Sequence, residues 1–279
     1  MTDKEINRYY RDKLVKPTFF TIENDTVQLF CATSGNDTLP PLLMIHGAPG
    51  AWYGSRNMMD DQELQQRYHI IAVDRLGYNK SKYKGKRTAV NSIELQSTAI
   101  HEALRLNRSF KTGVVMGSSY GAPIAAKMAI RYPHEFHHLI MLAPAIDPDL
   151  EKFWWFHRYI RSGLFIQTLP RFIRNASAEK FGHEAELRKL APEWSKLRVP
   201  ATVMQGGRDY IIEPENFDYA KKVLAGKDAR FIFLPDASHV IRWQNPDTVI
   251  SILKNVYSDV RKISAPSPAN HSESQMSNY

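Results

Sequence analysis

Residues 112–132 read TGVVMGSSYGAPIAAKMAIRY, and the rest of the chain is best interpreted around them. The first five residues form a short apolar run with branched side chains, which predicts a buried strand. The last eleven carry small and apolar residues at helical spacing, which predicts a helix. Pro123 falls in its first turn, where a missing N–H costs nothing. Between strand and helix lies the pattern G-x-S-x-G, made by Gly117, Ser119 and Gly121.

This pattern predicts the sharp strand-to-helix turn known as a nucleophile elbow. Both glycines are needed because the turn is tight and neighbouring backbone passes close, so a Cβ at either place would clash. The turn lifts the Ser119 hydroxyl above the sheet edge and places it at a helix N-terminus. The same five letters also occur by chance in loops, but the strand before and the helix after them favour the elbow.

Length and composition limit the possible classes of protein. The 279 residues suffice for one large α/β domain or two ordinary ones, and the formal charge of +8 suits a solvated surface as well as nucleic acid. Residues 1–8 lack the apolar core of a secretory signal, and no apolar run approaches the ~20 residues that cross a bilayer. Cys31 is the only cysteine, which excludes an internal disulfide and predicts a buried structural thiol. We expect a cytoplasmic protein without a membrane span.

Strand and helix patterns alternate along most of the chain. The hairpin expected over residues 18–32 has its turn at Asn24-Asp25. Further strands are predicted at 42–45, 68–74, 138–143, 201–206 and 230–234, and further helices at 92–106 and 246–262. This alternation predicts an α/β fold, a mostly parallel central sheet with helices on both faces.

The predicted α/β core comprises residues 18–145 and 198–263, preceded by an N-terminal arm over 1–17. Residues 146–197 break the alternation and are predicted to form an inserted helical lid, which would cover a site and exclude water. Its aromatic residues, from Phe153 to Phe172, are explained as well by packing of the lid onto the body. The Ser/Pro/Asn-rich tail over 264–279 is predicted to be disordered.

The order of motifs resembles the α/β-hydrolase superfamily over about residues 18–262. The matching features are HGAPG at 46–50, DRLGYNKS at 74–81, GSSYGA at 117–122, an acid after a late strand and a histidine before the last helix. The resemblance implies the α/β-hydrolase fold and a serine hydrolase whose nucleophile, acid and histidine follow in that order.

Ser119 is the candidate nucleophile, and a serine hydroxyl needs an adjacent base at neutral pH. His239 follows the final predicted strand and precedes the final helix, where the family has its histidine. The predicted acid is Asp209, just past a strand end, which would orient the imidazole and stabilise its charged form. Asp147 is the alternative, because some family members place the acid after the preceding strand.

The resemblance also implies an oxyanion hole of backbone N–H groups, whose donors need no reorganisation during the reaction. They would be the N–H of Tyr120 and the N–H of Ala48, since Pro49 cannot donate. We expect no cofactor and no metal ion, because no cysteine or carboxylate spacing supports a site around His134, His137 and His138.

A serine nucleophile separates the chain from epoxide hydrolases and haloalkane dehalogenases, which share the HGxP loop but have aspartate at the elbow. The loop also resembles proline iminopeptidases, which usually have HGGPG, a tryptophan in the elbow and acidic lid groups that hold the substrate ammonium. Here the elbow has Tyr120 and the first half of the lid is basic. Glu179, Glu184 and Glu186 are explained as well by a solvated helix face. We therefore favour a small or medium ester, thioester or lactone as the substrate.

Two other classes of function stay open. A lyase or receptor could retain the fold and the site without hydrolysis. A nucleic-acid or anionic-surface binder could use a basic run with no acids, made by Lys80, Lys82, Lys84, Lys86 and Arg87. A solvated loop is the usual meaning of such a run, so no nucleic-acid partner is expected.

Overall fold

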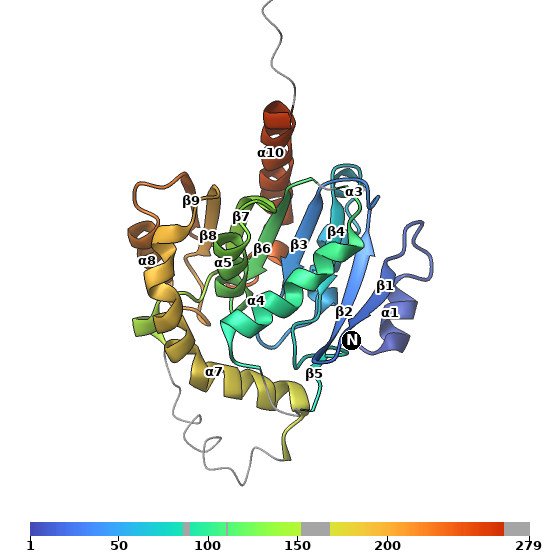
Figure 1. Cartoon of the computed structure of the whole chain (residues 1–279), viewed down its shortest axis with the longest axis horizontal. Helices are drawn as coiled ribbons and strands as arrows, with labels where there is room; N and C mark the ends of the chain where they lie inside the picture. The colour runs from blue at the N-terminus through green and yellow to red at the C-terminus, as the bar shows by residue number, and fades with distance from the viewer. Residues whose placement is uncertain (86–89, 110, 152–167, 265–279) are drawn as a thin grey trace, which may run out of the picture.

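The computed structural model describes residues 1–85, 90–109, 111–151 and 168–264. A nine-stranded sheet runs through them in the order β1-β2-β4-β3-β6-β7-β8-β9, with β5 paired to β2 (Figure 1). Pairing is antiparallel from β1 through β2 to β4 and parallel from β4 to β9. The strands are β1 (Thr18–Glu23), β2 (Val27–Ser34), β3 (Pro41–Ile45), β4 (His69–Val73), β5 (Lys82–Tyr83), β6 (Gly113–Ser118), β7 (Phe136–Leu142), β8 (Ala201–Gly206) and β9 (Ala229–Leu234).

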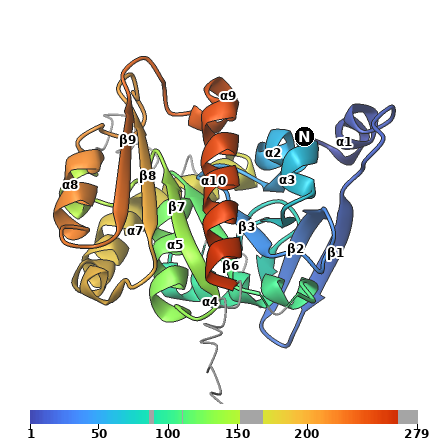
Figure 2. The ribbon, with the colours of Figure 1, turned by 90° about the horizontal axis from the view of Figure 1, so that it is seen from above.

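Helices cover both faces of this sheet. The helices α4 and α5 pack on one face, and α10 packs with α2 and α3 on the other (Figure 2). The α-helices are α1 (Asp3–Tyr9), α2 (Arg56–Met59), α3 (Gln62–Gln65), α4 (Ile93–His101), α5 (Gly121–Arg131), α7 (Arg171–Leu190), α8 (Asn216–Val223), α9 (Ile241–Gln244) and α10 (Pro246–Ser264). This architecture confirms the predicted fold class.

The central strands are buried on both sides, as parallel strands between two helical layers must be. Along β3, Leu43 and Ile45 join the core beneath α4 and α5, whereas Leu42 and Met44 join the core beneath α10. Successive side chains of a strand point to opposite faces, so one apolar run supplies two cores. Cys31 lies buried in the first of them, as predicted.

The element boundaries follow local signals. The predicted N-terminal hairpin is present, with Thr18 paired to Thr33 and Glu23 to Gln28. The helix predicted over 92–106 starts at Ile93, because the Ser92 side chain caps it by accepting the N–H of Leu95 at 3.2 Å. Its last part differs from the prediction, since Glu102–Leu106 continues as a 3-10 helix.

Part of the predicted lid is described by α7. The aromatic run of the predicted lid over 153–166 lies outside the described residues. So does the tail predicted to be disordered over 264–279, except for Ser264, which ends α10. The interpretation of the three glutamates as a solvated face is wrong for two of them. Glu179 is fully buried and Glu186 is 9% exposed, because both face polar groups of the body, whereas the Glu184 side chain is 47% exposed.

Two lysines of the basic run are paired with acids. The Lys80 ammonium lies 2.8 Å from Asp3, and that of Lys84 lies 2.8 Å from Glu23. Lys86 and Arg87 lie outside the described residues. In the described ranges, each helix is too short or too polar to cross a bilayer.

Candidate active site

The elbow places Ser119 between the end of β6 and the start of α5. Its backbone is left-handed, with φ of 53°, a conformation that costs a residue with a side chain on the order of 1–3 kcal/mol. The flanking glycines allow close approach. A Cβ on Gly117 would lie 2.2 Å from the Gly121 carbonyl oxygen, and one on Gly121 would lie 2.5 Å from that of Ile45. Neighbouring backbone therefore leaves no room for a side chain at either glycine, as the sequence predicts.

Asp209 and His239 meet beyond the carboxyl ends of β8 and β9. The His239 Nδ1 lies 2.8 Å from Oδ2 of Asp209, whose side chain is fully buried. The other carboxylate oxygen accepts the N–H groups of Ile211 and Ile212, each at 2.9 Å. Burial alone would raise the pKa of Asp209, but the hydrogen bond and charge of His239 and these N–H groups lower it below its ordinary value.

A carboxylate with a lowered pKa is ionised at neutral pH and can only accept hydrogen bonds. The His239 nitrogen that faces Asp209 is therefore the one that carries the proton. This leaves Nε2 of the neutral ring with a lone pair, which suits a general base.

Asp147, the alternative acid, has a different environment. Its Oδ1 accepts the N–H of Asp149 at 2.9 Å and caps the short turn Pro148–Leu150. Its own N–H donates to the Asn216 side chain at 2.9 Å. The structure thus brings Asp209, and not Asp147, to His239.

A cavity of about 340 Å³ opens beside Ser119. Ala48 and Tyr120, whose N–H groups the resemblance implies as oxyanion donors, line it together with Ser119. The loop after β3 packs directly against the elbow, since a Cβ on Gly47 would lie 2.9 Å from the Ser119 Cβ. Helix α7 contributes one wall, with Ile173, Ala176, Ser177, Lys180 and His183.

His46 braces the loop that carries Ala48. Its Nε2 accepts the N–H of Arg75 at 3.0 Å, and its Nδ1 donates to the Gly47 carbonyl oxygen at 2.7 Å. Burial, and then the charge of Arg75, hold the pKa of His46 well below its ordinary value. The ring is therefore neutral, and its single proton is on the nitrogen that holds the loop.

Sequence reasoning missed a polar cluster in the cavity wall. The His183 Nδ1 lies 2.7 Å from Glu151, which also pairs with Lys180, and the His183 ring stacks on Tyr120 with centroids 4.3 Å apart. Burial would raise the pKa of Glu151, but the hydrogen bond from His183 and the charges of both partners lower it. Lys180 and His183 are three residues apart on one helix, but nothing in the sequence pairs them with Glu151.

The histidines around β7 bind separate partners. The His138 Nε2 lies 2.9 Å from the Thr202 hydroxyl, and the His137 Nδ1 lies 3.1 Å from the Thr112 carbonyl oxygen. Across the residues that the structure describes, no group of three or more His, Cys, Asp or Glu side chains is arranged to hold a metal ion.

Comparison with known proteins assigns the family. The sequence model of the alpha/beta hydrolase fold matches residues 40–199, more than half of the chain. The chain belongs to the alpha/beta hydrolase fold family. This agrees with the resemblance that the order of its motifs predicts.

Two lipases and a solved structure match over most of the chain. Lipase 3 of Moraxella sp. (strain TA144) is 24% identical over 272 residues, which cover 86% of this chain and 84% of that protein. Lipase 1 of Psychrobacter immobilis is 23% identical over 274 residues, covering 86% and 83%. A solved membrane phospholipase A has a TM-score of 0.65 at 19% identity, over 88% of this chain and 87% of that one, and this likeness shows the fold alone.

Proposed function

We propose that this alpha/beta hydrolase cleaves a small or medium ester, thioester or lactone through an acyl-enzyme at Ser119. His239 acts as the base and Asp209 orients it. The observation that carries this proposal is the 2.8 Å contact between Asp209 and His239, at the same edge of the sheet as the serine elbow. The similarity to two lipases over most of their lengths supports an ester as the substrate.

In the proposed reaction, the Ser119 oxygen attacks the carbonyl carbon while His239 takes the serine proton. The oxyanion that forms accepts hydrogen bonds from the N–H groups of Ala48 and Tyr120. The intermediate collapses as His239 gives its proton to the leaving group. Water, deprotonated by the same histidine, then attacks the acyl-enzyme, releases the acid and restores the Ser119 hydroxyl.

The side of the cavity formed with α7 favours a neutral ester over a cationic aminoacyl substrate. Glu151 lines the cavity and would be a candidate partner for a substrate ammonium. Its carboxylate is already bound by Lys180 and His183. A substrate cation would have to displace these partners, and its charge would then lie close to the like charge of Lys180, which is unfavourable.

The test compares Ser119→Ala with Ser118→Ala, its neighbour in the same turn. Turnover of p-nitrophenyl esters should fall by at least ~10³-fold in Ser119→Ala, because the nucleophile is lost. A fluorophosphonate probe should label the wild type and Ser118→Ala but not Ser119→Ala. A prolyl p-nitroanilide, assayed in parallel, should be cleaved slowly.

Ester turnover that survives in Ser119→Ala would contradict the proposal, and fast prolyl cleavage without ester turnover would indicate a proline iminopeptidase-like enzyme. A folded wild type that neither turns over esters nor reacts with the probe would indicate a non-hydrolytic member of the fold.

A further inference from the structure

We propose that Glu179 of α7 is a positioning residue for the oxyanion hole and acts through Arg75. The inference rests on the proposed function, because it concerns the N–H of Ala48 as an oxyanion donor. Glu179 lies in the described part of the predicted lid, whereas the elbow lies on a different part of the chain.

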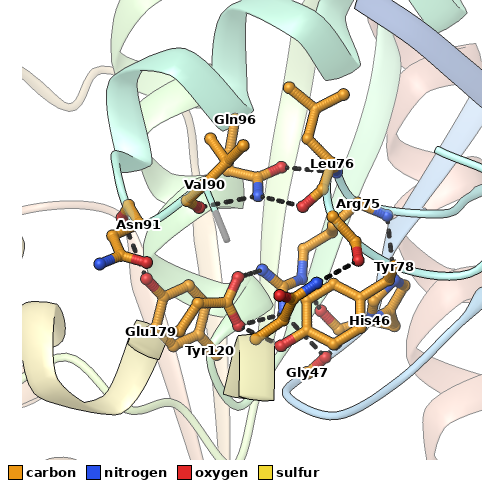
Figure 3. A network of polar contacts seen from close by, with 12 residues as sticks. His46, Gly47, Arg75, Leu76, Tyr78, Val90, Asn91, Gln96, Tyr120 and Glu179 are labelled. Carbon is orange, nitrogen blue, oxygen red and sulfur yellow. Dashed lines mark hydrogen bonds and ion pairs between the residues drawn. The ribbon is translucent and has the colours of Figure 1, made fainter. Parts of the chain in front are cut away.

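A single guanidinium group bridges α7 and the loop that follows β3 (Figure 3). Arg75 Nη1 donates to Glu179 Oε1 at 2.6 Å, and Nη2 donates to Oε2 at 3.0 Å. On its other side Nε donates to the His46 carbonyl oxygen at 2.9 Å, and Nη2 donates to that of Gly47 at 3.0 Å. Each of the three guanidinium nitrogens of Arg75 thus donates to the helix or to the loop.

The Gly47 carbonyl and the Ala48 N–H belong to one peptide unit. Such a unit is planar and trans, so its C=O and N–H point in opposite directions. Two donors hold the Gly47 oxygen, His46 Nδ1 at 2.7 Å and Arg75 Nη2 at 3.0 Å. They therefore set the direction of the Ala48 N–H. A positive charge on the carbonyl side also polarises the peptide and strengthens its N–H as a donor.

Arg75 depends on Glu179 for its own position. Arg75 is fully buried, and its guanidinium lies 4.7 Å from the ring centre of Tyr78 and 4.8 Å from that of Tyr120. In the described ranges, the acidic side chain that pairs with the Arg75 guanidinium is Glu179. The carboxylate is itself held by the Tyr78 hydroxyl at 2.5 Å. Removing Glu179 would leave a buried charge without its partner, so the guanidinium would have to turn away from the loop.

The docking of α7 around Glu179 is specific. The Asn175 side chain donates to the Gly77 carbonyl oxygen one turn before it. The Glu186 carboxylate accepts the N–H of Ile93 at 2.9 Å two turns after it. These contacts fix α7 against the loop after β4 and the start of α4, which keeps Glu179 in place.

The experiment measures kcat and KM of Glu179→Gln against Glu184→Gln, a glutamate on the same helix whose side chain is half-exposed. We expect kcat of Glu179→Gln to fall ~10- to 100-fold with KM little changed, because loss of a whole oxyanion donor costs ~10²–10³ and acts on the transition state. Inhibition by a trifluoromethyl ketone, which forms an oxyanion on Ser119, should weaken by a similar factor. Glu184→Gln should match the wild type in all three.

A double variant protects the test against loss of folding. Arg75→Met with Glu179→Leu removes both charges at once, a replacement that buried ion pairs often tolerate. This variant should fold and be as slow as Glu179→Gln, because the Gly47 carbonyl has lost its charged donor. Wild-type kcat in either folded variant, or a loss confined to KM, would overturn the inference. Failure of both to fold would also overturn it, since the pair would then serve folding. An inactive wild type or an active Ser119→Ala would instead overturn the proposed function, and would show this without any variant at Glu179.

Discussion

The Asp209 carboxylate is held by four donors, which come from His239, Ile211, Ile212 and Gln205. A carboxylate so bound is stabilised in its charged form and has little freedom to turn. It can therefore keep the imidazole in one tautomer and one orientation during proton transfer. Asp147 has one backbone donor to its side chain and serves a turn.

At this scale we predict different outcomes for two matched substitutions. Asp209→Asn should lower kcat for an ester substrate by ~10⁴-fold with the fold retained, because the amide favours the wrong tautomer. Asp147→Asn should stay close to wild type, since asparagine caps a turn as well as aspartate. Steady-state kinetics and circular dichroism of both variants make the comparison. A large loss in Asp147→Asn with an active Asp209→Asn would reverse the assignment of the acid.

The β6–α5 unit is the element on which the site depends. It is packed so closely that the strand end, the helix start and the loop after β3 touch through backbone atoms. Backbone atoms cannot move aside as a flexible side chain can, and overpacked interiors lose stability for this reason.

We predict that Gly117→Ala lowers the free energy of unfolding by about 1–3 kcal/mol, the usual cost of overpacking. Its Cβ would lie 2.2 Å from the Gly121 carbonyl oxygen. Gly54→Ala is the control, because its Cβ would meet the tip of the Arg242 side chain at 3.0 Å, and that tip can move. Urea unfolding measures both. Equal stability of the two variants would mean that the elbow is more adaptable than its geometry indicates.

Across the whole molecule, a sheet covered on both faces buries groups that titrate below neutral pH. His69 is 3% exposed, and its Nδ1 accepts a hydrogen bond from the Asn107 side chain at 3.2 Å. Burial lowers the pKa of His69 to about 4. The pKa of Asp74 shifts in the opposite direction, because burial raises it to about 6 despite the hydrogen-bond donors around the carboxylate.

The sign of the pH dependence follows from these shifts. Between pH 6.5 and 4 the unfolded chain protonates His69 and the folded protein does not, so this residue makes stability fall as the pH is lowered. Asp74 takes up its proton first in the folded state and so opposes the trend between about pH 6 and 4. The unfolding free energy that the protein loses on acidification should therefore be smaller in His69→Gln. We predict a difference of up to ~1.4 kcal/mol per pH unit between pH 6.5 and 4. Urea unfolding at pH 5 and 7 tests this, with His134→Gln, at an exposed histidine, as the matched control. An unaltered dependence in His69→Gln would contradict the argument.

The sequence by itself determined the fold class and the candidate nucleophile. Both depend on patterns that are local in the chain, namely the strand, G-x-S-x-G and helix at 112–132 and the short apolar strand runs that alternate with helices. The order of the motifs added His239 and Asp209 as candidates, but it left Asp147 open. It also named Ala48 and Tyr120, which line the cavity beside Ser119.

Only the tertiary structure decided which distant groups meet. Asp209 faces His239 across 30 residues, and Arg75 binds Glu179 across 104. A glutamate at a given helical spacing has the same local pattern whether it faces water or a buried arginine, so Glu179 and Glu186 could not be distinguished from Glu184. The cluster of Glu151, Lys180 and His183 was missed for the same reason. The energy of a buried charge depends on the partner that the fold places beside it, and the local sequence around the charged residue does not identify that partner.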